Sequence, residues 1–230
     1  MIILALDMVW WRNLLGLQEQ ATFVKEYEEK FSSRIPNARP VEQLSFVILD
    51  TETTGLNVKA DYILSFGAVR LKKYCLKVDS AIEFYLKAPA IQSNAYQVHG
   101  LLTQAQVTDL RKFAEDFLAY IGTDILVGHH LSFDLAMLQK ALRPFGFRKF
   151  LNPTLDTIQL AMRLEQGIHY DQSLGKPGEY ALDTLCKRYS VPLDDRHTAA
   201  GDALLTAQLL MKLLKKAESM GIKDNGSLFR

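Results

Sequence analysis

The spacing of apolar positions separates an N-terminal helical stretch from a longer segment of strands and helices. Between residues 10 and 31 apolar residues recur at alternating three- and four-residue steps, the period of an amphipathic helix. This stripe consists of Trp10, Leu14, Leu17, Ala21, Val24 and Phe31. Pro36 and Pro40 then interrupt periodic structure. We therefore expect residues 1–44 to form a helical extension that precedes the main domain.

The segment that follows has the pattern of β-strands. SFVILDTE, residues 45–52, is almost continuously apolar, as expected for a strand covered on both faces of a sheet. Residues 61–73 and 74–88 are rich in β-branched and aromatic side chains and follow closely after it. This pattern predicts an antiparallel meander of three strands.

Helices and strands alternate after the meander. A short apolar strand is expected at residues 124–129, and a last long helix is expected from near His197 to Met220. The remaining helical spacings fall in residues 108–122, 132–146, 153–167 and 181–191. This order predicts an α/β domain with a mixed sheet and helices on its faces. We place the domain at residues 45–220 and a tail at residues 221–230.

Composition and charge limit the classes of function. The chain has 230 residues with a hydrophobic fraction of 48%, enough for one substantial core with a small appendage. Its 27 basic and 26 acidic residues give a net charge of +1, so a polyanion must be held locally. Cys75 and Cys186 form no metal-binding pattern, and the apolar start carries Asp7 and no basic region. We expect reduced thiols, a cytoplasmic location and no membrane contact.

Two acids lie at the end of the first predicted strand. Alternate side chains of a strand share a face, so Asp50 and Glu52 point the same way. Burying two like charges requires compensation, and a cation would supply it. Oxygen ligands suit Mg²⁺, whereas zinc is disfavoured because no cluster of Cys or His accompanies the acids. The alternative is that the strand ends in a cleft where both carboxylates stay solvated and have a purely structural role.

Two further acids lie near expected helix starts. Asp134 and Asp202 are each stabilised there by the helix dipole, by about 0.3 to 1 kcal/mol, and neither position alone requires a catalytic role. His197 precedes Thr198, a good N-cap, so it would lie in the loop before the helix and reach the site. The alternative for His197 is an exposed loop histidine.

Three motifs resemble those of the DEDDh family of 3′-to-5′ exonucleases, and most closely its DnaQ-like branch, typified by the proofreading ε subunit of bacterial DNA polymerase III. They are LDTETTG at residues 49–55, GHHLSFDLAML at 128–138 and RHTAAGDALLTAQLL at 196–210. The similarity covers about residues 45–216. It implies a ribonuclease-H-like fold, a five-stranded mixed sheet flanked by helices, in agreement with the element order.

The resemblance also implies a catalytic set. Asp50, Glu52, Asp134 and Asp202 would hold two divalent cations, Mg²⁺ or Mn²⁺, with Asp50 between them, Glu52 and Asp202 on the first and Asp134 on the second. One cation would activate water and the other would stabilise the leaving 3′ oxygen. His197 would accept the proton of the attacking water.

The implied substrate is the single-stranded or frayed 3′ end of DNA, from which nucleoside 5′-monophosphates would be released. The substrate-binding residues implied in this way are Thr53, Gly55, Leu56, His99, His130 and Phe133. Leu56 would wedge against a base, and His99 would line the sugar or phosphate. His130 stands where relatives commonly have Asn, and the alternative for it and for His129 is a strand-end histidine satisfied by hydrogen bonds.

Two other functions stay open. An exoribonuclease or oligoribonuclease would use the same site on RNA ends, because the choice depends on recognition of the 2′-hydroxyl. The chain would instead be a binding or proofreading subunit if the N-terminal helix docked onto a polymerase or a second copy of the chain. A catalytically inactive relative is disfavoured because all five catalytic positions are present.

Overall fold

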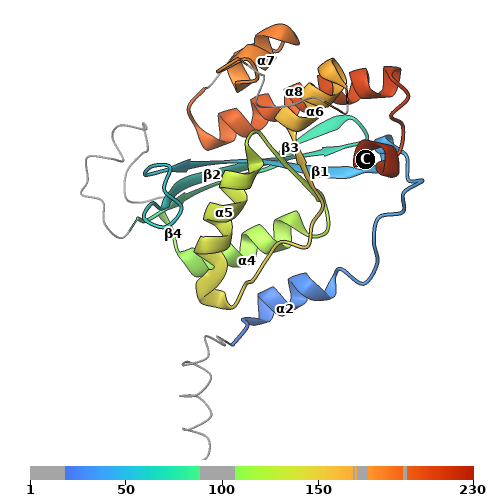
Figure 1. Ribbon diagram of the computed structural model, residues 1–230. Helices are drawn as coiled ribbons and strands as arrows, with labels where there is room; N and C mark the ends of the chain where they lie inside the picture. The colour runs from blue at the N-terminus through green and yellow to red at the C-terminus, as the bar shows by residue number, and fades with distance from the viewer. Residues whose placement is uncertain (1–18, 89–106, 168, 170–175, 194–195) are drawn as a thin grey trace, which may run out of the picture.

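The computed structural model describes residues 19–88, 107–167, 169, 176–193 and 196–230, and within them a mixed sheet forms the centre of the molecule (Figure 1). The sheet has six strands in the order β4-β3-β2-β1-β5-β6. They are β1 (Ser45–Thr53), β2 (Ile63–Lys72), β3 (Cys75–Leu86), β4 (Val107–Thr108), β5 (Ile125–Gly128) and β6 (Thr154–Asp156). β1, β2 and β3 pair antiparallel, which confirms the predicted meander, and β5 and β6 continue the sheet in parallel with β1.

The predicted mixed sheet is therefore confirmed, with one strand more than the five expected. The additional strand, β4, has two residues and pairs with the end of β3. A strand this short carries no periodic pattern in the sequence.

Helices cover both faces of the sheet (Figure 1). On one face lie α2 (Thr22–Glu29), α4 (Leu110–Ile121) and α5 (Leu131–Leu142). On the other face lie α6 (Thr157–Gln166), α7 (Leu182–Arg188) and α8 (Ala199–Ser219). The shorter elements are η1 (Val41–Gln43), η3 (Arg143–Phe145) and α9 (Asn225–Leu228).

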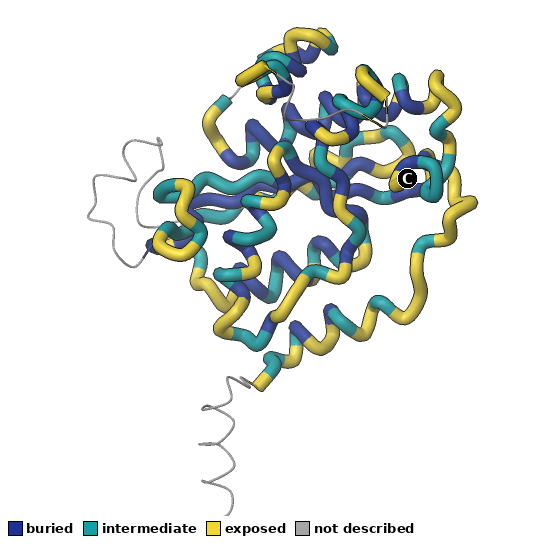
Figure 2. Tube along the Cα trace, in the orientation of Figure 1, coloured by how far each residue is buried: buried dark blue, intermediate teal, exposed yellow. Residues whose placement is uncertain are grey.

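The central strand β1 is buried on both faces, as its apolar run predicted (Figure 2). Phe46 and Ile48 pack into the cluster that includes side chains of α6, α7 and α8. Val47 and Leu49 point the other way, into the cluster that includes side chains of α4 and α5. This alternation directs the side chains that follow on β1 to opposite faces of the sheet.

The N-terminal helix is shorter than the stripe of residues 10–31 predicted, because Ala21 is extended and α2 spans only Thr22–Glu29 in the described residues; this helix packs onto the main domain. Val24 and Tyr27 of α2 are buried, and the Tyr27 hydroxyl donates to Asn152 Oδ1 at 2.6 Å. Burial raises the pKa of Tyr27 to about 12. The stripe residues Trp10, Leu14 and Leu17 lie outside the described residues. The division at residues 44 and 220 remains a prediction from the sequence.

The C-terminal segment also contacts the domain. Arg163 of α6 donates to the backbone oxygens of Ser227 and Leu228, and Leu228 is buried. Asp224 caps α9 through the amide of Ser227 at 2.8 Å. In the part of the chain that the structure describes, every helix is too short or too polar to traverse a lipid bilayer.

Candidate active site

Three carboxylates meet at the end of β1. Ligand oxygens of Asp50, Glu52 and Asp202 lie within 4.8 Å of one another. The parallel pairing of β1 with β5 runs from Phe46 to Ile48, so Asp50 and Glu52 lie beyond it, on the part of β1 that pairs with β2. The structure thus brings together the two acids that share a strand face and one acid from helix α8.

Gly67 sets the position of α8 over this strand end. Gly67 pairs with Asp50 across the β1–β2 ladder. A Cβ atom at position 67 would lie 2.3 Å from the backbone nitrogen of Ala200, so α8 begins directly against the glycine. Gly67 was not among the predicted site residues, although a glycine inside a strand often marks a close backbone approach.

The start of α8 agrees with the prediction. Thr198 is the N-cap, and its side chain accepts a hydrogen bond from the Gly201 amide at 3.0 Å. Asp202 is buried in the first turn of the helix. His197 precedes the cap, with an exposed side chain and a φ of 68°. The predicted placement of His197 in the loop before α8 is confirmed.

Asp134 reaches the site from the other face of the sheet. It is buried in the first turn of α5, and the Thr51 hydroxyl donates to its Oδ1 at 2.6 Å. Thr51 lies between Asp50 and Glu52 and points to the opposite face, so one strand end holds acids on both sides. The hydrogen bond from Thr51 to Asp134 was not predicted, because the sequence does not show which helix covers that face of the sheet.

Two of the carboxylates have strongly raised pKa values. Burial raises the pKa of Asp50 well above its usual value, and the charges of Asp134, Asp202 and Glu52 raise it further. Burial raises the pKa of Asp134 to about 7, against the lowering effect of the Thr51 hydrogen bond. A site of crowded, desolvated carboxylate oxygens fits a hard divalent cation such as Mg²⁺ or Mn²⁺. Asp50, Glu52 and Asp202 could hold one such ion, and Asp134 adds a fourth carboxylate close to Asp50.

Arg196 is a basic residue in the site that the sequence analysis missed. Its Nη1 donates to Asp202 Oδ1, and its Nε donates to Asp183 Oδ1 of α7 at 2.6 Å. Its charge lowers the pKa of Asp50, against the effect of the neighbouring acids. Arg196 adjoins the third motif, but nothing in its spacing indicated a contact with the acids.

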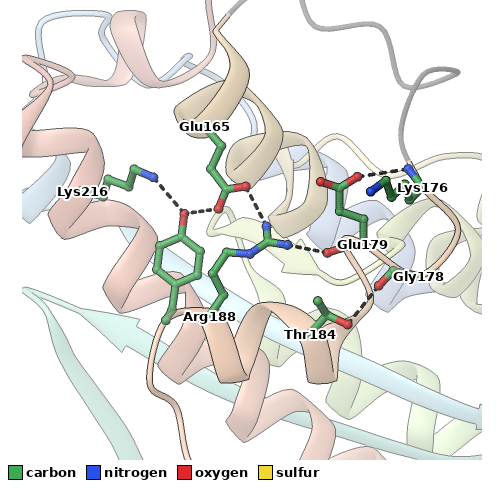
Figure 3. Close-up of polar contacts among 8 residues, drawn as sticks. Glu165, Lys176, Gly178, Glu179, Thr184, Arg188 and Lys216 are labelled. Carbon is green, nitrogen blue, oxygen red and sulfur yellow. Dashed lines mark hydrogen bonds and ion pairs between the residues drawn. The ribbon is translucent and has the colours of Figure 1, made fainter.

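A polar network fixes α7, which carries Asp183 (Figure 3). Glu165 of α6 accepts from Arg188 Nη1 at 2.7 Å and from the Tyr189 hydroxyl at 2.8 Å. Lys216 of α8 donates to the Tyr189 hydroxyl at 3.2 Å. Arg188 and Thr184 also donate to backbone oxygens of Glu179 and Gly178, at the turn before α7. α6, α7 and α8 are thereby linked behind the site.

The loop after β1 presents Leu56 to solvent. Leu56 is 85% exposed, and the Thr53 hydroxyl donates to the Gly55 carbonyl at 2.8 Å. Asp61 organises the loop by accepting from the Thr54 hydroxyl at 2.7 Å and the Asn57 amide at 2.8 Å. The hydrogen-bonded loop thus exposes the large apolar side chain of Leu56, and its contact with a base remains a prediction.

The other three predicted substrate residues are in different situations. His99 lies outside the described residues. His130 is exposed with a φ of 61° at the start of α5, and Phe133 is half-buried against the core. His130 occupies the N-cap position of α5 but its side chain makes no capping hydrogen bond. The Asp156 side chain accepts a hydrogen bond from the Leu131 amide at 2.9 Å.

His129 is held inside the structure. Its Nδ1 lies 2.9 Å from Thr157 Oγ1, as the hydrogen-bonded alternative proposed. Burial lowers the pKa of His129 to about 4, so the ring is neutral at pH 7.

Comparisons with known proteins agree with this geometry. A family model described as "Exonuclease" and named for RNase T matches residues 47–210. The chain is 33% identical over 184 residues to the DNA polymerase III PolC-type of Oceanobacillus iheyensis, covering 79% of this chain and 12% of that protein. It is 31% identical over 193 residues to the corresponding Bacillus subtilis protein, covering 83% and 13%. The chain thus spans about one eighth of these relatives.

Solved structures of E. coli exonuclease I share the fold. The complex with a dT13 oligonucleotide superimposes with a TM-score of 0.62 at 18% identity, covering 78% of this chain and 43% of that one. The complex titled ExoI/SSB-Ct gives a TM-score of 0.58 at 18% identity, covering 77% and 42%. The family match confirms the resemblance to DnaQ-like exonucleases that the three motifs indicated. The chain belongs to the exonuclease family of RNase T.

Proposed function

We propose that this chain is a metal-dependent 3′-to-5′ exonuclease of the DEDDh type. It hydrolyses the terminal phosphodiester of DNA, at a single strand or a frayed 3′ end, and releases nucleoside 5′-monophosphates. The observation that carries this proposal is the convergence of Asp50, Glu52 and Asp202, whose ligand oxygens lie within 4.8 Å of one another in a member of an exonuclease family.

Each residue of the site has a role in this proposal. Asp50, Glu52, Asp134 and Asp202 would hold two Mg²⁺ or Mn²⁺ ions, which when bound activate water and stabilise the leaving 3′ oxygen. Thr51 keeps Asp134 oriented through its hydrogen bond. His197 takes the proton from the attacking water, because a neutral imidazole nitrogen can accept a proton and its loop position before α8 leaves the ring exposed.

The preference for DNA rests on the named relatives. These are PolC-type DNA polymerases and an exonuclease crystallised with a thymidine oligonucleotide. They favour a role in DNA replication or repair and the 3′ end of a single strand as the bound partner. Leu56 wedges against the terminal base, and Thr53, Gly55, His99, His130 and Phe133 line the rest of the binding surface.

The packing of α2 limits which side chains could dock the chain onto a polymerase. Val24 and Tyr27 face the chain's own domain, so they offer no docking surface to a polymerase or a second copy. Docking of the N-terminal stripe onto a partner would therefore have to use side chains other than Val24.

The test is degradation of matched DNA and RNA oligonucleotides labelled at the 3′ or the 5′ end, with Mg²⁺ or Mn²⁺ and with EDTA. We expect metal-dependent release of 5′-monophosphates from the 3′ end of DNA. Asp50→Ala should abolish it, whereas Asp79→Ala, an exposed acid on β3, should not. Activity that survives in Asp50→Ala would contradict the site, and faster degradation of RNA would identify an exoribonuclease.

A further inference from the structure

We propose that Arg196 is a permanent counter-ion of the carboxylate site, which neutralises and positions Asp202 in the metal-free protein and competes with divalent cations for it. This inference rests on the proposed function, because the competing ion is the metal that the exonuclease reaction requires.

The geometry divides the Arg196 guanidinium between two acids. One arm contacts Asp202, which belongs to the three-carboxylate cluster, and the Nε contacts Asp183 Oδ1 at 2.6 Å. The side chain of Arg196 is 21% exposed and that of Asp202 is 12% exposed, so this ion pair is largely shielded from water. A guanidinium in such a pair stays charged at every pH at which the protein is folded.

The positive charge of Arg196 has opposite effects on the metal-free site and on the metal-bound site. Without metal, Asp50, Glu52 and Asp202 repel one another, and the positive charge of Arg196 contacts Asp202 directly. When a divalent cation binds, the guanidinium is a like charge at the same carboxylate and opposes it. Arg196 therefore stabilises the empty site and weakens its affinity for metal.

Asp183 determines what happens to Arg196 when it leaves Asp202. Asp183 is half exposed and is not one of the three clustered acids. It lies on α7, which Arg188 and Thr184 fix through the network of Figure 3. Arg196 thus keeps one partner at the rim of the site, and its release from Asp202 does not require it to become unpaired.

The experiment is a calorimetric titration of the metal-free full chain with Mn²⁺. Arg196→Met and Arg196→Gln remove the charge, and glutamine keeps hydrogen-bond donors for Asp202 in case the methionine variant fails to fold. Both should bind Mn²⁺ on the order of tenfold more tightly than the wild type. Arg196→Lys keeps the charge and should stay close to the wild type. Arg148→Met removes a charge from an exposed position and is the matched control.

A second measurement separates this role from simple support of the fold. In EDTA the melting temperature of Arg196→Gln should fall by several degrees, because the three acids lose their counter-ion. Saturating Mn²⁺ should remove most of this difference. A purely structural arginine would lower the melting temperature equally with and without metal.

The outcomes distinguish this inference from the proposed function. Mn²⁺ binding that Asp50→Ala abolishes, with no gain in affinity in the neutral Arg196 variants, would overturn the counter-ion role alone. If neither the wild type nor the neutral variants bind Mn²⁺ in a way that depends on Asp50, both proposals are wrong. Tighter binding in Arg196→Gln but not in Arg148→Met would support both.

Discussion

Gly67 of β2 lies directly against Ala200, the second residue of helix α8. Gly67 also pairs with Asp50 of β1, so this contact places the start of α8 next to Asp50. A Cβ atom at position 67 would be 2.3 Å from the Ala200 nitrogen and 2.4 Å from the Ala199 carbonyl carbon. The nearest atoms belong to backbone, which cannot move aside as a flexible side chain can. The absence of a side chain at Gly67 therefore allows Asp202 to reach Asp50 and Glu52.

Gly67→Ala should displace α8 and separate Asp202 from the other acids. We expect the free energy of unfolding to fall by about 1 to 3 kcal/mol, the usual cost of overpacking, together with a loss of Mn²⁺ affinity. Urea unfolding and calorimetry measure the two effects. Ala200→Gly in the same chain should not rescue them, since the clash is with backbone, and rescue would show that the contact is misplaced.

Thr51→Val should remove the hydrogen bond that Thr51 donates to Asp134. That bond lowers the pKa of Asp134, so its loss should shift the acidic limb of the pH–rate profile to higher pH. A hydrogen bond to a charged group contributes about 1.5 to 3 kcal/mol, which urea unfolding at pH 8 would detect. Thr51→Ser keeps the hydroxyl and should behave as the wild type. An unshifted profile in the valine variant would contradict the role of Thr51.

The stability of the metal-free protein should depend on the protonation of Asp134. Its pKa is raised by burial to about 7, above the ordinary value of 3.8, so between these two pH values the folded chain retains a proton that the unfolded chain has lost. The contribution of Asp134 to the free energy of unfolding in EDTA should therefore fall as the pH rises from about 4 to about 7. Asp50, whose pKa is also raised, acts in the same direction, whereas His129, whose pKa is lowered to about 4, acts in the opposite direction. Urea unfolding across this range measures the slope.

Asp134→Asn removes this titration, so its gain in stability over the wild type should grow as the pH rises from 4 to 8. Asp79→Asn, an exposed acid, should leave the slope unchanged. The same pH dependence of stability in the wild type and in Asp134→Asn would show that Asp134 is not buried as described.

His197→Asn should lower turnover without affecting metal binding. Asparagine tolerates the positive φ of 68° at this position, so the loop should keep its shape while losing a general base. We expect kcat to fall by about 10² to 10⁴ with unchanged Mn²⁺ affinity. An unaltered kcat would identify His197 as an ordinary surface residue.

Leu56→Ala should affect substrate and not stability. Leu56 is 85% exposed, so its truncation should change the free energy of unfolding by less than about 0.5 kcal/mol. The value of kcat/KM on single-stranded DNA should fall by at least about fivefold if the side chain contacts a base. Val78→Ala, also exposed, is the control. Equal values of kcat/KM in the Leu56→Ala and Val78→Ala variants would show that Leu56 does not contact the substrate.

The sequence alone determined the order of the elements and the identity of the acids. The strand at residues 45–52 and the helix that begins after Thr198 could be predicted because their signals are local: an apolar run and a capping residue. Asp50 and Glu52 could be placed on one face because strand periodicity is independent of the rest of the fold.

Only the tertiary structure decided how these acids are supported. The hydroxyl of Thr51 is 83 positions from Asp134, and Gly67 meets Ala200 from a distant part of the chain. Arg196 reaches an acid of α7 as well as Asp202. Such contacts depend on which face of the sheet each helix covers. The spacing of apolar residues along the chain does not predict that face. Local motifs therefore identify the acidic residues of the site. Their hydrogen bonds, ion pairs and pKa shifts arise from packing between segments that are distant in the sequence.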